Sequence, residues 1–299
     1  MSAKNPLTKI VEKVLQSGQF ILGQELVQLE KEIARYCGIK YAVGVGNGTD
    51  ALYLSLKALG ISEGDEVITT PFTFIAPAEA IANCGAKPVF VDINYEDFLI
   101  NPKLIKKAIT EKTKAILPVH LFGQRCNMSE ILDTASEYGL DVIEDAAQAF
   151  GTKGLGEGNA LCFSFHPSKS LGSCGDAGMV LTNEKDVAEK VRLLRNHGAK
   201  YHQKYNNLIL GTNSRLDEIQ AAVLRYKLKH FERKRLWTFR TPNRKLLQKY
   251  LDEQDIDNKI FYSKLLQFQP CFQYLGYQKG DFPVAEKATK EVLSVNIYD

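Results

Sequence analysis

The chain lacks long hydrophobic runs: across its 299 residues no window approaches the length and apolarity of a membrane span. Its first twenty residues mix Lys, Glu and Gln with apolar residues and offer no signal-peptide core. No internal repeat or low-complexity tract is visible either. We therefore expect a cytoplasmic globular protein that neither crosses nor binds a membrane.

Closely spaced cysteine pairs are also missing. The six cysteines are scattered without any C-x-x-C spacing, which favours reduced thiols over a disulfide framework or a zinc site, so no metal is expected. The net charge is only +3, from 38 basic and 35 acidic residues, and it implies no nucleic-acid partner. Residues 227–240, the densest basic run, are typical of a solvated helix face.

Seven short apolar runs are mostly separated by amphipathic segments. The runs cover residues 42–45, 67–70, 89–92, 115–119, 142–144, 160–165 and 179–182. Such alternation predicts an α/β fold with a mostly parallel sheet. Only a short Gly/Ser/Lys-rich stretch separates the last two runs, so no crossover helix fits between them and that pair is predicted to be antiparallel.

Helical periodicity predicts further elements. Helices are expected over 24–37, 51–59, 184–197, 213–235 and 284–293. Gly38 should end the first as a C-cap, and Asn213 or Ser214 should cap the fourth.

A glycine-rich turn, Gly46-Asn47-Gly48-Thr49-Asp50, connects the first apolar run to a helix. A strand, a glycine turn and a helix N-terminus in this order can direct several backbone N–H groups and the helix dipole at one anion, such as a phosphate. The same pattern also fits a plain turn in which Thr49 or Asp50 caps the helix. No G-K-[ST] follows, so the turn is not a P-loop.

Two further candidates follow strands, at the sheet edge where open α/β folds bind ligands. Asp145 comes just after a hydrophobic run and is either a helix cap or the partner of a positively charged ligand nitrogen. Lys169 follows the run 160–165 and Pro167. A lysine presented there can attack a carbonyl and form a Schiff base, although most lysines after strands are solvated loop charges.

Together these segments resemble the DegT/DnrJ/EryC1/StrS family of pyridoxal-phosphate-dependent nucleotide-sugar aminotransferases. The resemblance covers about residues 18–228 and 244–299. It is carried by GNGTDAL (46–52), GDEVITTPFTFIA (64–76), GAKPVFVDI (85–93), TKAILPVHLFG (113–123), VIEDAAQAFG (142–151), FSFHPSKSLG (163–172) and NSRLDEIQAAVL (213–224). It implies the type I fold of this cofactor class, with a seven-stranded mixed sheet, helices on both faces and a small C-terminal domain.

The resemblance also implies residue roles around the cofactor ring. Lys169 matches the lysine that binds the cofactor aldehyde and later moves the reacting proton, and Asp145 matches the carboxylate paired with the protonated pyridine nitrogen. Gln148 matches the residue bonded to the phenolic oxygen, and Phe74 matches the aromatic stacked on the ring. His166 is carried over as a residue that positions substrate or relays a proton.

The cofactor phosphate has its own matched residues. Thr49, Asp50 and Ser164 match the phosphate cradle. Asn213 matches a phosphate ligand that family members receive from the neighbouring subunit, which implies a homodimer. Arg215 is a further candidate anion contact.

The implied reaction moves an amino group from L-glutamate, or glutamine, to a UDP- or dTDP-linked keto-sugar. Its product is an amino-sugar nucleotide for a glycan, such as O-antigen or lipopolysaccharide, or for a secondary metabolite. The turn Asn47-Gly48-Thr49-Asp50 resembles members that aminate C3 more than those that aminate C4.

The chain departs from the family pattern in its C-terminal part. Relatives carry several dozen more residues at the position where Leu236-Trp237-Thr238 here joins two segments directly, and they continue beyond Asp299. We therefore expect a large cofactor-binding domain over 1–235 and a shortened small domain over 236–299, with Trp237, Phe239, Phe261 and Phe268 exposed. The segment 151–160 is also shorter than usual. At Gln267 the usual P-L-H-L-Q reads Leu-Leu-Gln-Phe-Gln, without its histidine.

Two alternatives remain. In related sugar dehydratases the Schiff-base lysine is replaced by histidine, and Lys169 argues against that branch. The other alternative is a catalytically impaired or regulatory subunit, which the missing segment favours and the intact cofactor residues oppose.

Overall fold

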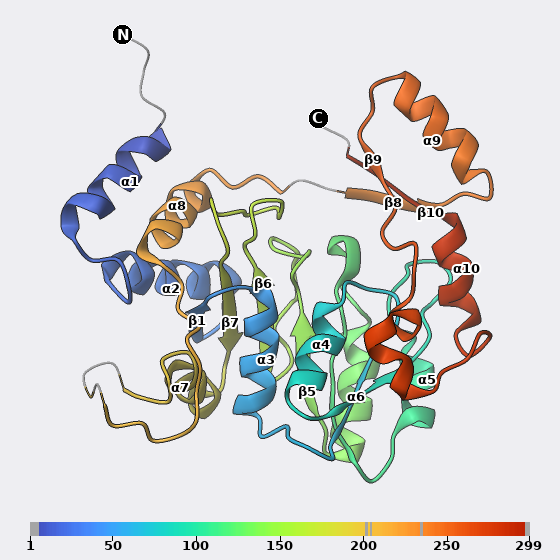
Figure 1. Ribbon diagram of the computed structural model, residues 1–299, viewed down its shortest axis with the longest axis horizontal. Helices are drawn as coiled ribbons and strands as arrows, with labels where there is room; N and C mark the ends of the chain where they lie inside the picture. The colour runs from blue at the N-terminus through green and yellow to red at the C-terminus, as the bar shows by residue number, and fades with distance from the viewer. Residues whose placement is uncertain (1–5, 201–202, 204, 234–235, 297–299) are drawn as a thin grey trace. The chain divides into compact units, whose positions relative to one another are not determined.

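The computed structural model describes residues 6–200, 203, 205–233 and 236–296 (Figure 1). The chain forms two compact units, one comprising Met1–Ser62 and Ile143–Arg233 and the other Glu63–Val142 and Lys234–Asp299. The domain division expected at residue 235 stays a prediction. Among the described residues, none of the helices has the length and apolar character needed to cross a membrane.

A seven-stranded mixed sheet is the main feature of the fold, as predicted. Its strands are β1 (Tyr41–Val45), β2 (Glu66–Thr69), β3 (Lys87–Phe90), β4 (Thr113–Ile116), β5 (Asp141–Asp145), β6 (Ala160–Ser164) and β7 (Gly178–Thr182). Their order is β1-β7-β6-β5-β4-β2-β3. Strand β7 runs antiparallel to both β1 and β6, and the other pairs are parallel, which confirms the predicted antiparallel pair.

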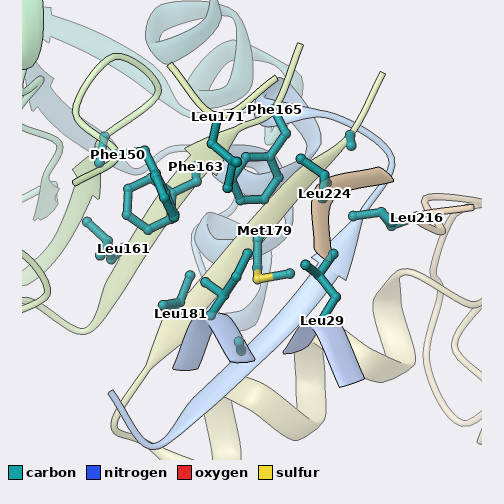
Figure 2. Packing of buried hydrophobic residues seen from close by; sticks show 14 of the residues in the cluster. Leu29, Phe150, Leu161, Phe163, Phe165, Leu171, Met179, Leu181, Leu216 and Leu224 are labelled. Carbon is teal, nitrogen blue, oxygen red and sulfur yellow. The ribbon is translucent and has the colours of Figure 1, made fainter. Parts of the chain in front are cut away.

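The first unit places helices on both faces of its strands. These helices are α1 (Pro6–Ser17), α2 (Gln24–Cys37), α3 (Gly48–Ala58), α7 (Lys185–Leu194) and α8 (Glu218–Lys229). Successive side chains of β6 point to opposite faces of the sheet. Cys162 Sγ lies 3.3 Å from Ser55 Oγ of α3, whereas its neighbours Leu161 and Phe163 join the core on the side of α2 and α8. Figure 2 shows this core, in which Leu29, Met179 and Leu224 come from three different elements.

Two buried carboxylates, those of Glu218 and Glu144, accept hydrogen bonds from backbone N–H groups in this unit. Glu218 accepts hydrogen bonds from the N–H groups of Gly23, Glu25 and Leu26, so it caps the N-terminus of α2. Glu144 of β5 accepts from the N–H of Gly156 at 3.1 Å and of Gly158 at 2.8 Å. The short segment 151–159 is thus folded around the Glu144 carboxylate.

The second unit contains the remaining strands and the C-terminal residues. Its helices are α4 (Ala76–Asn83), α5 (Pro102–Ala108), η1 (Leu121–Gly123), α6 (Met128–Tyr138), α9 (Arg244–Glu253), η2 (Leu266–Phe268), η3 (Pro270–Leu275) and α10 (Pro283–Glu291). A separate antiparallel sheet has the order β8-β10-β9, formed by Leu236–Arg240, Val292–Asn296 and Asn258–Lys259. The Asp92 carboxylate accepts from the N–H groups of Val284 and Ala285 and caps α10.

Several predicted boundaries were wrong. Helix α8 begins at Glu218 rather than near Asn213, because the Ser214 hydroxyl bonds elsewhere and supplies no cap. It ends at Lys229; of the predicted remainder, residues 234–235 lie outside the described residues. The last helix ends at Glu291, and β10 follows because Val292, Leu293 and Val295 pair with β8.

The small sheet has one partly uncovered face. Trp237 and Phe239 of β8 lie opposite Val295 and Leu293 of β10, so their side chains share a face. Leu293 and Val295 are buried in a cluster with Leu251, whereas Trp237 is 55% exposed and Phe239 is also exposed. Of the four aromatic residues expected to be exposed, these two are; Phe261 and Phe268 are half-buried.

Candidate active site

The glycine-rich turn leads directly into α3. Asn47 is the N-cap, and its side chain accepts the N–H of Asp50 at 2.8 Å. The suggested caps, Thr49 and Asp50, are therefore wrong, since both lie in the first turn of the helix. A Cβ on Gly48 would stand 2.6 Å from the Ser164 Cβ at the end of β6, so only glycine lets this turn lie against Ser164. Thr49, Asp50 and Ser164 are thus brought together at a helix N-terminus, which suits an anion.

Ser214 connects the segment before α8 to the same turn. Its hydroxyl donates to Asp50 Oδ2 at 2.6 Å and accepts the N–H of Gly46 at 3.0 Å. Sequence reasoning missed this role, although Ser214 lies in the NSRLDE block beside Asn213. Asn213 itself is exposed and forms an isolated bridge with Asn196. The predicted phosphate ligand Asn213 is therefore adjacent in sequence to a residue that holds the turn.

Asp145 is the last residue of β5 and is only 5% exposed. Its Oδ1 accepts the N–H of Ala147 at 2.9 Å, so the local capping interaction exists. This bond fixes the direction of the carboxylate at the carboxyl end of a parallel strand. Gln148 lies in the turn that follows and is half-buried.

Lys169 lies in the loop between β6 and β7. Its backbone N–H donates to His166 O at 2.8 Å, which closes a tight turn that contains Pro167. Burial lowers the pKa of the Lys169 amine, and the nearby charge of Asp145 opposes this effect in part. A lowered pKa increases the fraction of neutral, nucleophilic amine near neutral pH. His166 is exposed, and its Nδ1 is 2.9 Å from Ser168 Oγ.

Three further residues that the sequence singled out are Phe74, Gln267 and Arg215. Phe74 belongs to the second unit, in the loop after β2, and is 57% exposed. Gln267 of η2 is 2% exposed, and neither its Nε2 nor its Oε1 has a hydrogen-bond partner among the residues that the structure describes. Arg215 donates to Asn196 Oδ1 at 3.4 Å, while its buried Nε finds no partner in the described part of the chain.

The donor set of the first unit fits pyridoxal phosphate. A helix N-terminus with Ser164 and Thr49 suits the phosphate, Asp145 suits a protonated ring nitrogen, and Lys169 suits the aldehyde. Together with the seven-stranded mixed sheet, these features define an α/β transferase dependent on pyridoxal phosphate.

The chain belongs to the DegT/DnrJ/EryC1/StrS aminotransferase family, whose model matches residues 2–237 and 235–299. It is 44% identical to the "Pleiotropic regulatory protein" of Geobacillus stearothermophilus, over 99% of this chain and 90% of the relative. It is 38% identical to the dTDP-3-amino-3,4,6-trideoxy-alpha-D-glucose transaminase of Streptomyces venezuelae, over 96% of this chain and 86% of that protein.

Solved structures agree with this assignment. The fold matches S. venezuelae DesV with a TM-score of 0.92 and 38% identity, over 97% of this chain and 88% of DesV. It also matches Ntda of Bacillus subtilis, solved with the bound cofactor PMP, with a TM-score of 0.88 and 32% identity, over 98% and 77% of the two chains.

The relatives contain a segment that this chain lacks. The two stretches that match the family model meet at residues 235–237, where the sequence analysis places the gap. The alignment with the Geobacillus relative spans 336 positions, more than the 299 residues of this chain. The relative therefore contains residues without a counterpart here.

Proposed function

We propose that this aminotransferase transfers the amino group of L-glutamate to a UDP- or dTDP-linked keto-sugar in the cytoplasm. The observation that carries the proposal is the half-buried Lys169, whose pKa is lowered by burial and which is influenced by the charge of Asp145. The names of relatives support the substrate class: besides the dTDP-sugar transaminase, the chain is 37% identical to the UDP-2-acetamido-2-deoxy-3-oxo-D-glucuronate aminotransferase of Pseudomonas aeruginosa, over 99% of this chain and 91% of that protein. The six scattered cysteines, without any C-x-x-C pair, fit the reducing conditions of the proposed cytoplasmic location.

The cofactor phosphate would be held by Thr49, Asp50 and Ser164, with the N-terminus of α3 opposite its charge. Asp50 is itself an acid, and its Oδ2 already accepts the hydroxyl of Ser214. Its backbone N–H is already donated to Asn47 Oδ1, so the contribution of Asp50 would come from ordering Ser214 and the turn. When bound, pyridoxal phosphate supplies an aldehyde that carries the amino group and a ring that accepts an electron pair.

The protein's own residues would control the protons. Asp145 would keep a proton on the ring nitrogen, and its carboxylate is already oriented by the N–H of Ala147. Lys169 Nζ would take the proton from the amino-bearing carbon of glutamate and later deliver a proton to the sugar carbon. Gln148 would hold the phenolic oxygen, and Phe74, on the second unit, stays the proposed stacking residue. His166 is exposed enough to position substrate or relay a proton.

A homodimer would complete the site with Asn213 of the second subunit. The loop before Asn213 exposes three successive apolar side chains, Leu208, Ile209 and Leu210, the last 98% exposed. Successive exposed apolar residues are unfavourable in water and are typical of an interaction surface. The proposal therefore pairs this loop, and the adjacent Asn213, with a second copy of the chain.

The carbon proposed for amination is C3, as the turn around Gly48 suggests and as the 3-amino and 3-oxo names of the two transaminase relatives support. The test is to load the purified protein with pyridoxal phosphate, add L-glutamate, and follow the visible absorption of the cofactor. Paired 3-keto and 4-keto nucleotide sugars are then added and the amino-sugar products identified by mass spectrometry. Lys169→Ala should abolish both responses, and turnover of the 4-keto sugar alone would reverse the assignment of the carbon.

A regulatory subunit is the second candidate, favoured by the name of the Geobacillus relative. It predicts binding of pyridoxal phosphate without any spectral change on addition of glutamate or glutamine. A glutamate-dependent change that requires Lys169 would exclude it.

A further inference from the structure

The loop that carries Lys169 is attached to helix α8 as well as to the sheet. On the sheet side, the N–H of Ser173 and its hydroxyl both donate to Phe165 O, at 2.8 and 2.7 Å. These bonds close the loop next to the end of β6. The contacts to α8 lie at Gly172 and Cys174, on either side of Ser173, and come from two polar side chains of the helix.

Gln220 makes the first contact. Its Oε1 accepts the N–H of Cys174 at 3.0 Å, and the Cys174 Sγ lies 3.1 Å from the same oxygen. A Cβ on Gly175 would stand 2.8 Å from Gln220 Nε2, so the backbone can approach this side chain closely because residue 175 is glycine. The Gln220 amide therefore bonds the backbone of the loop and packs closely against it.

Lys227 makes the second contact. Its Nζ donates to Gly172 O at 2.5 Å, three residues after Lys169. Gln220, Leu224 and Lys227 share one face of the helix, since they are spaced by four and three residues. Leu224 is fully buried in the same cluster as Leu171 of the loop, as Figure 2 shows. The face of α8 therefore presents one apolar and two polar contacts to the loop, at Leu171, Gly172 and Cys174.

We propose that Gln220 and Lys227 are positioning residues that hold the Lys169 loop for its reaction with the cofactor. The role rests on the proposed function in one respect, the reactivity of Lys169. The same stretch of chain also holds the phosphate turn, because Ser214 bonds Asp50 and Gly46 just before α8 begins. One continuous segment, residues 214–227, thus holds both the turn and the lysine loop.

Cys174 offers a local probe of the loop. Cys174 and Cys271 are the exposed free cysteines of the described chain, so a Cys271→Ser background leaves Cys174 as the exposed thiol. The variants are Lys227→Met, which keeps the length but removes the donor, Lys227→Arg, which restores a donor, and Gln220→Leu. Lys229→Met is the matched control, since Lys229 is an exposed lysine on the same helix, whereas Lys227 and Gln220 are the α8 residues seen to bond the loop in the described part of the chain.

Two rates are measured in each variant. One is the reaction of Cys174 with an aromatic disulfide reagent. The other is the labelling of Lys169 by pyridoxal phosphate followed by borohydride, quantified on the Lys169 peptide by mass spectrometry. Lys227→Met and Gln220→Leu should each raise the Cys174 rate and lower the Lys169 rate by roughly fivefold, the ratio expected for one lost hydrogen bond. Lys227→Arg should restore both rates, and Lys229→Met should change neither.

The proposal is overturned if Lys227→Met and Gln220→Leu leave Lys169 labelling at the wild-type rate, or if Lys227→Arg is as impaired as Lys227→Met. The Arg rescue separates positioning from a general loss of folding, which the arginine would not repair. If Lys169 of the wild type takes no label from pyridoxal phosphate, the proposed function fails instead. Amide hydrogen exchange over residues 166–177 in the same variants then decides whether α8 holds the loop.

Discussion

Replacing Gln267 with leucine should raise the free energy of unfolding of the second unit. The side chain is 2% exposed, and both of its polar atoms lack a partner among the described residues. Burying a polar group without a hydrogen bond costs about 1–3 kcal/mol by mutational data. Leucine has nearly the same volume and no polar atom, so it removes this cost without opening a cavity. We expect a gain of about 1–3 kcal/mol.

Urea unfolding of the free protein measures this gain. The single tryptophan, Trp237, lies in the same unit as Gln267, so its fluorescence reports on that unit. With a urea m value of about 3 kcal/mol/M, the midpoint should rise by ~0.3–1 M. Gln269→Leu is the control, because the neighbouring Gln269 is only half-buried and its change should stay within about 0.5 kcal/mol.

A lower midpoint for Gln267→Leu would refute the reasoning, since it would mean that the amide is hydrogen-bonded in the free protein in solution. A higher midpoint together with a raised KM for the keto-sugar would mean that the protein gives up stability to present an amide to its substrate. Such an amide can both donate to and accept from a sugar hydroxyl.

Three other predictions concern the chemistry. Asp145→Ala should slow the glutamate half-reaction by roughly 10²–10³ in stopped-flow absorbance, because the ring nitrogen loses its counter-charge; a rate near wild type would remove Asp145 from this role. The pH midpoint for amine labelling of Lys169 should lie below the ordinary lysine value of about 10.4, because burial lowers the pKa of this amine; a midpoint above that value would contradict this cause. Asp145→Asn should lower the midpoint further, because the charge of Asp145 raises the same pKa; a higher midpoint in this variant would contradict that cause. Because the chain lacks the segment near Leu236, the glutamate half-reaction should proceed normally, whereas the rate of the keto-sugar half-reaction should saturate very weakly with sugar concentration, since binding energy from the remote nucleotide is lost. Ordinary saturation of the second half-reaction would show that the remaining C-terminal residues build a complete substrate site.

The sheet could be predicted from the sequence because its signals are local. Each strand is a short apolar run, and the missing room for a crossover helix after β6 revealed the antiparallel pair β6/β7. The site residues of the first unit could be predicted for a related reason: Asp145 ends a strand, and Thr49 and Lys169 follow strands through short turns. Their roles came from the family resemblance, which periodicity alone does not supply.

The remaining features depend on contacts between segments far apart in sequence. Ser214 reads locally as a helix cap, yet its hydroxyl bonds Asp50, 164 residues away. The first residues of strand β10 were predicted as the end of a helix, because their pairing with the distant strand β8 leaves no local signal. The buried amide of Gln267 likewise has no local signature, because burial is decided by the tertiary structure.

Contacts within the segment 151–159 after β5 limit where residues can be inserted into it. The Glu144 carboxylate collects the N–H groups of Gly156 and Gly158, and a Cβ on Gly156 would collide with the side chain of Ile39. An insertion between these two glycines would separate two N–H groups that the buried Glu144 carboxylate accepts, whereas one at the exposed residues 153–154 leaves both in place. For anyone grafting a peptide tag or a longer loop from a relative, the tolerant splice point is therefore at residues 153–154, before Gly156.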